Sequence, residues 1–114
     1  MRTTPHTLGI RFYLYGSACL PLVAMAERVT AAVQLPLGRR VSSVRGTYFR
    51  WSGDHGADIV VQANVADEDG RLVEADHPVH GVLVYATGLP EASYQALDEV
   101  DGLELLVGET VLVT

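Results

Sequence analysis

Tyrosine and arginine recur at alternate positions of short strand-like segments, and this combination carries most of the chemical content of the sequence. In the segment 8–15 the alternating polar positions are Arg11, Tyr13 and Tyr15. Tyrosine joins a rigid contact surface to a hydroxyl group, and arginine adds a planar fork of hydrogen-bond donors. These two residue types are typical of surfaces that recognise a protein partner and of pockets that hold an anionic ligand.

Other segments place side chains of the same kinds on the same expected face. Successive residues of a strand point to opposite sides of a sheet, so Tyr48 and Arg50 point away from the core if Phe49 and Trp51 point into it. By this reasoning four of the five tyrosines share one face. The candidate binding residues on this face are Arg11, Tyr13, Tyr15, Tyr48, Arg50, Gln62, Asn64 and Tyr85.

The remaining reactive side chains give weaker signals. Cys19 stands at an expected helix start, but its apolar neighbours favour a buried and inert thiol. His77 and His80, with Asp54 or His55, are ligand types for a divalent metal, but their spacing favours a solvated loop with two titrating imidazoles. No phosphate-binding glycine loop, serine nucleophile motif or cysteine pair is present. We therefore expect no metal and no cofactor, and the sequence identifies no catalytic residue.

Charged clusters are expected to be solvated. The segment 67–70 is acidic, but Val65 stands where a calcium loop needs its first ligand. Asp98, Glu99 and Asp101 lie at the end of an expected helix, where negative charge opposes the helix dipole. The pair Arg39-Arg40 follows an expected helix stop and is interpreted as a solvated turn.

The elements that position these residues follow from the spacing of apolar side chains. Period-two alternation predicts strands, and the three-to-four spacing after Pro21 and after Pro90 predicts helices. The expected strands are 8–15, 41–51, 57–65, 80–87 and 103–113, and the expected helices are 19–34 and 90–102. The second and third of these strands are expected to form a hairpin.

The predicted order is β-α-β-β-β-α-β, a mostly antiparallel sheet with two helices on one face. This α+β arrangement resembles a ferredoxin-like layout with one extra strand. Such a layout hosts many unrelated functions, so it does not itself assign one. Residues 1–7 are expected to be flexible, and 8–114 are expected to form one domain.

Charge and composition limit the class of partner. The chain of 114 residues has a formal net charge of −6, with seven arginines and one acid in residues 1–53, and one arginine and thirteen acids in residues 54–114. This balance makes nucleic-acid binding unlikely. The sequence has no long apolar run and no signal-peptide pattern, so we expect a cytoplasmic protein without a membrane span.

Three functions remain open at this point. The first is a small acidic bacterial binding protein, an immunity- or antitoxin-like inhibitor that uses the Tyr/Arg-rich face. The second is a small cofactor-independent enzyme, possibly biosynthetic, with a pocket for a small anionic ligand on the same face of a homodimer. The third is an accessory homodimer in which two such faces pack together.

Overall fold

The computed structural model describes residues 8–66 and 69–113, so the expected flexible segment 1–7 lies outside the described residues. All six strands belong to one sheet, in the spatial order β2-β3-β4-β5-β1-β6, and all neighbours are antiparallel. The strands are β1 (Leu8–Ser17), β2 (Gly38–Ser42), β3 (Gly46–Ser52), β4 (Asp58–Ala63), β5 (Val82–Thr87) and β6 (Glu104–Val113).

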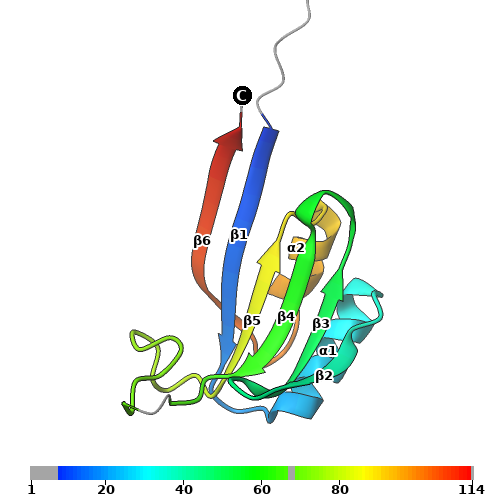
Figure 1. Cartoon of the computed structure of the whole chain (residues 1–114). Coiled ribbons are helices and arrows are strands. Elements are labelled where there is room, and N and C mark those ends of the chain that lie inside the picture. Colours follow the sequence, from blue (N-terminus) through cyan, green and yellow to red (C-terminus); the bar gives the residue numbers. More distant parts are fainter. Residues whose placement is uncertain (1–7, 67–68, 114) are drawn as a thin grey trace, which may run out of the picture.

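Two helices, α1 (Leu22–Val33) and α2 (Glu91–Asp98), lie together on one face of the sheet (Figure 1). Neither is long and apolar enough to span a bilayer, a finding that covers the described part of the chain. The prediction of an α+β fold with an antiparallel sheet and two helices is confirmed. The exact ferredoxin-like order is not matched, because this sheet has six strands and a ferredoxin-like sheet has four.

The sixth strand arises because the expected strand 41–51 is a hairpin. The hydroxyl of Ser42 accepts hydrogen bonds from the backbone N–H groups of Val44 and Arg45, which turns the chain between β2 and β3. Gly46 follows with a φ of 71°, a conformation that favours glycine. Arg39 and Arg40 therefore lie on the edge strand β2 and not in a turn, which corrects the interpretation of that pair.

The expected orientation of β1 is wrong. Tyr15 is fully buried on the helix side and its hydroxyl donates to Asp98 Oδ1 at 3.4 Å. Tyr13 packs against Tyr94 of α2 with ring centroids 4.7 Å apart, and Arg11 pairs with Glu91 of α2. Aromatic rings provide more apolar area than the aliphatic side chains of this strand, so the tyrosines fill the space beneath α2.

The strands β3, β4 and β5 have the expected orientation. The core between the sheet and the helices joins apolar residues from α1, β4, β5 and α2. Phe49 and Trp51 pack at its margin, so Tyr48 and Arg50 lie on the opposite face. We call this opposite side, which carries no helix, the helix-free face. The fully buried core side chains include Met25, Val29, Ile59, Val61, Val84 and Leu97.

Tyr94 connects the core to the backbone of two neighbouring segments. Its hydroxyl accepts from the N–H of Leu89 at 3.2 Å and donates to the carbonyl of Arg11 at 3.2 Å. Tyr94→Phe leaves both backbone groups without this partner, so the free energy of unfolding should fall by about 1–3 kcal/mol. Chemical denaturation measures the change. Tyr13→Phe is the control, because the structure gives that hydroxyl no hydrogen bond to another described residue; equal losses in both variants would contradict the assigned role.

One end of the sheet is a two-stranded ribbon. The first residues of β1, from Leu8 to Arg11, pair only with the segment 110–113 of β6. Figure 1 shows these two strands extending past the others toward the chain ends. The ribbon makes β6 a long edge strand, whereas β2 is a short one with two arginines.

Candidate ligand site on the helix-free face

The sheet register brings four of the predicted binding residues together on the helix-free face. Tyr48 of β3 pairs with Gln62 of β4, and Arg50 pairs with Val60, which in turn pairs with Tyr85 of β5. Because paired residues of antiparallel strands point to the same side, these side chains form two adjacent rows. The expected orientation of these four side chains toward the helix-free face is therefore confirmed, and their role in binding stays a prediction.

The helix-free face is hollowed at its centre. A hollow of about 400 Å³ is lined by Arg45, Asp58, Val60, Gln62 and Tyr85, with Val44 and Val73 at its sides. A second hollow of about 280 Å³ adjoins it across Tyr85 and is lined by Phe12, Leu14, Glu74, Thr87, Val107 and Glu109, among others. We call the two hollows together the Tyr85 trough. Its size is that of a small-molecule site.

One wall of the trough is the connection between β4 and β5, and Asn64 holds it in place. The Asn64 side-chain amide donates to the carbonyls of Glu74 and His77 at 3.3 and 3.0 Å, and its oxygen accepts from the N–H of Glu74 at 2.9 Å. Glu74 then accepts a hydrogen bond of 2.5 Å from the Tyr85 hydroxyl. Asn64, predicted as a binding residue, is thus an organising residue of this wall.

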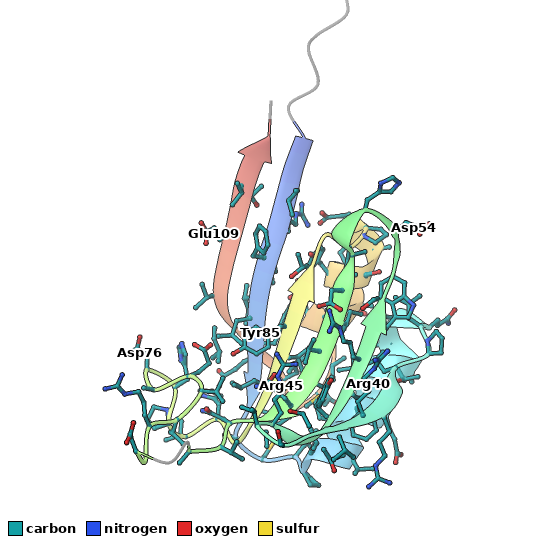
Figure 2. The ribbon with its side chains drawn as sticks, viewed as in Figure 1. Arg40, Arg45, Asp54, Asp76, Tyr85 and Glu109 are labelled. Carbon is teal, nitrogen blue, oxygen red and sulfur yellow. The ribbon has the colours of Figure 1, made fainter. Side chains whose placement is uncertain are left out.

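The opposite wall is the turn between β2 and β3, which presents Arg45. The guanidinium of Arg45 lies over the Tyr48 ring, 5.1 Å from its centroid. Arg45 forms no ion pair with any of the described residues. In Figure 2 Arg45 and Tyr85 lie over the middle of the sheet, with Arg40 to one side of them. Arg45 therefore offers the trough a positive charge that no acid of the described chain neutralises.

Arg50, which the sequence suggested as an anion holder, is already engaged. Its Nε donates to Asp58 Oδ1 at 2.9 Å and its Nη2 donates to Oδ2 at 3.4 Å. This bidentate pair raises the pKa of Arg50. Asp58 of this pair lines the trough, and Arg45 is the lining cation that forms no ion pair with the described residues.

The two polar groups on the floor have different roles. Burial and the hydrogen bond to Glu74 raise the pKa of Tyr85 above its ordinary value, so the hydroxyl remains protonated at neutral pH. Gln62 is buried at 4 % exposure and lines the trough, yet its amide forms no hydrogen bond with another described residue. The floor thus offers an amide able to donate and accept.

Three predicted binding residues lie elsewhere. Arg11, Tyr13 and Tyr15 pack against α2 on the other face, and therefore do not contribute their side-chain charge or hydroxyls to the trough.

Conversely, sequence reasoning missed Arg45 and Glu74. The signal for Arg45 was the run Ser42-Ser43 before Gly46, which is typical of a turn rather than of a continuous strand.

The structure also gives the positions of Cys19 and of the two histidines His77 and His80. Cys19 is exposed, not buried as expected, and lines a hollow of about 330 Å³ beside Gly102 and Glu104. His77 and His80 are neighbours with ring centroids 5.9 Å apart, and His80 pairs with Glu104. Within residues 8–66 and 69–113 no group of three potential ligands is arranged to hold a metal ion.

No protein-family model matches the chain, and no curated protein is significantly similar to it.

Proposed function

We propose that the protein binds a small organic anion with an apolar group in the Tyr85 trough. The proposal rests on the surroundings of Arg45. This residue has no acid partner among the described residues, and it faces a hollow with the Gln62 amide and the protonated Tyr85 on its floor. An arginine without an acid partner at the wall of a hollow is suited to hold an anionic group. Arg45 and Gln62 would hold the anionic group.

The second hollow suggests the other half of the ligand. Its floor and side carry Leu14, Phe12 and Val107, which are apolar, and Phe12 and Val107 are 43 % and 47 % exposed. Burying such surface favours an apolar ligand group by about 25 cal/mol for each Å² removed from water. An aryl or alkyl group fits this part of the trough, with Tyr85 between the two halves.

The enzyme form of this proposal assigns Tyr85 as a proton donor. A tyrosine hydroxyl is protonated at neutral pH, and the hydrogen bond to Glu74 holds this one at the side of the trough. This form needs no cofactor. We also propose a cytoplasmic location, in keeping with the exposed and unpaired thiol of Cys19.

The test uses phenylpropionate as the anion and phenylpropionamide as its neutral analogue, each titrated into the full chain and followed by calorimetry. We expect the anion to bind and Arg45→Gln to weaken its binding by about tenfold or more, because a charge-assisted hydrogen bond is lost. The amide should bind the natural chain and Arg45→Gln equally.

Arg28→Gln is the matched control, because Arg28 is an exposed arginine of α1 on the other side of the sheet. It should leave the affinity unchanged. An affinity that Arg45→Gln does not alter, or that Arg28→Gln lowers as much, would refute the assigned role of Arg45.

A second function, the immunity- or antitoxin-like inhibitor, is favoured by a separate observation. Acidic residues with no ion pair to another described residue border the helix-free face, among them Asp76 and Glu109, and exposed Val73 and Val107 lie beside them. Such a border would steer the chain toward a basic toxin surface. If a toxin is captured, Asp76→Asn with Glu109→Gln should slow association at low ionic strength; an unchanged association rate would count against steering.

A further inference from the structure

Charged side chains without an ion pair to another described residue lie along two borders of the helix-free face. Arg40 and Arg45 belong to the hairpin of β2 and β3, and neither has an ion pair with another described residue. On the opposite side lie Asp76 in the connection after β4 and Glu109 on β6, as Figure 2 shows. We call these the basic border and the acidic border. Between them runs the Tyr85 trough.

The strip between the borders is more apolar than a solvated sheet face usually is. Phe12, Val73 and Val107 are 43 %, 47 % and 47 % exposed on this side, whereas Leu14, Val60 and Leu83 on the same face are buried within the chain itself. A central apolar area with charged margins is the arrangement of a protein interface. Exposed apolar patches of this kind mark interaction sites.

The borders identify the occupant as a second copy of this chain. In a dimer with two-fold symmetry the same surface is used twice, so a face with one basic and one acidic border complements itself. When two sheets pack face to face, a two-fold axis parallel to the strands places β2 and β3 of one copy over β6 and β1 of the other. A two-fold axis perpendicular to the strands would instead place each border against the same border of the partner, where like charges repel.

We propose that two copies pack helix-free face against helix-free face about a two-fold axis parallel to their strands. The basic border of each copy then lies against the acidic border of its partner, and the strands of the two sheets are nearly aligned. The Tyr85 trough of each copy is closed by the other copy. This proposal does not depend on which ligand the trough binds, or on whether it binds one.

Pairing through the edge of β6 is the competing dimer. It would bring the two copies of Glu104 and Glu109 close to the same axis, where like charges repel. Face-to-face packing instead opposes unlike charges. Face-to-face packing buries only the side of β6 that faces away from the helices, whereas edge pairing brings side chains from both sides of β6 near the partner strand. This difference can be tested.

The test is sedimentation equilibrium of the full chain with no ligand present. We expect a dimer whose dissociation constant rises with ionic strength, since the borders are exposed to salt. Val107→Asp should raise that constant by about tenfold or more. Leu105→Asp is the matched control, because Leu105 lies on the same strand, is 48 % exposed and faces the helix side.

A charge exchange tests the borders themselves. Arg45→Glu and Glu109→Arg should each weaken the dimer, and the double variant should recover most of the loss. Circular dichroism checks that each variant remains folded. A monomer at all ionic strengths would overturn the proposal. A dimer that Val107→Asp leaves intact, or that Leu105→Asp weakens equally, would overturn the face-to-face arrangement in favour of the edge.

The dimer test and the ligand-binding test can fail independently of each other. A monomer that still binds phenylpropionate through Arg45 overturns the dimer and leaves the proposed function standing. A salt-sensitive dimer that binds no anion overturns the proposed function and leaves the dimer standing.

Discussion

The free energy of unfolding should fall steeply as the pH rises above about 10, because three tyrosines have pKa values above that of the unfolded chain. Burial raises the pKa of Tyr15, Tyr85 and Tyr94, and the neighbouring Asp98 and Glu74 add to the effect at Tyr15 and Tyr85. The unfolded chain loses its tyrosine protons near pH 10, whereas the folded chain retains them. The folded state therefore binds more protons, and alkali favours unfolding.

Each tyrosine adds at most about 1.4 kcal/mol to the loss for every pH unit. Urea denaturation between neutral pH and about pH 11 measures this slope. Tyr15→Phe should reduce the slope by up to that amount, although it also removes the hydrogen bond to Asp98 at neutral pH. A slope that Tyr15→Phe does not alter would show that Tyr15 titrates as it does in the unfolded chain.

Asn64→Ala should destabilise the protein and loosen the wall of the Tyr85 trough. Three hydrogen bonds join the Asn64 side chain to the backbone of Glu74 and His77. At about 0.5–1.5 kcal/mol for each bond, we expect a loss of about 2–4 kcal/mol. The amide hydrogen of Glu74 should also exchange with solvent faster, because its acceptor is removed. Denaturation and hydrogen exchange followed by NMR measure the two effects.

Two variants separate this role from a general effect of substitution. Asn64→Asp retains the acceptor for Glu74 but puts a carboxylate oxygen against the carbonyls of Glu74 and His77, so its loss should be no smaller than that of Asn64→Ala. Gln95→Ala should have little effect, because Gln95 is an exposed residue of α2. Rapid exchange at Glu74 in the natural chain would contradict the ordering of this wall.

Local pattern was sufficient for most of the fold. Pro21 and Pro90 directly precede the two helices, and the alternation in 57–65 predicted both the strand β4 and its buried side. The hairpin between β3 and β4 was also predicted correctly. These features depend on residues close in the sequence, where spacing and turn chemistry decide the structure.

The errors arose where distant segments decide the structure. In β1 both alternating sets of side chains include apolar or aromatic residues, so the pattern alone does not decide which set faces the helices. Contacts with α2, more than seventy residues later in the chain, place Tyr15 and not Leu14 on the helix side. Leu14 is nevertheless buried, because the opposite face is covered in part by the connection after β4. A strand buried on both sides has no polar face for a sequence pattern to reveal.

The positions of the candidate site residues were predicted in part for the same reason. Gln62 and Tyr85 meet because β4 and β5 pair, and that pairing followed from the strands themselves. Arg45 reaches them from a turn that the sequence analysis placed inside a strand, and Glu74 reaches them from a long connection without regular structure. The position of such a connection depends on side-chain contacts, here those of Asn64, rather than on local preference.

The most direct test of the Tyr85 trough is to map where the anion binds. Phenylpropionate is titrated into isotope-labelled full-length chain, and the backbone amide shifts are followed by NMR. We predict that the largest saturable shifts occur at Arg45, Gln62 and Tyr85 and in the segment 73–74, and that they are lost in Arg45→Gln. Saturable shifts centred on the hollow beside Cys19, or no saturable shift at all, would contradict the account.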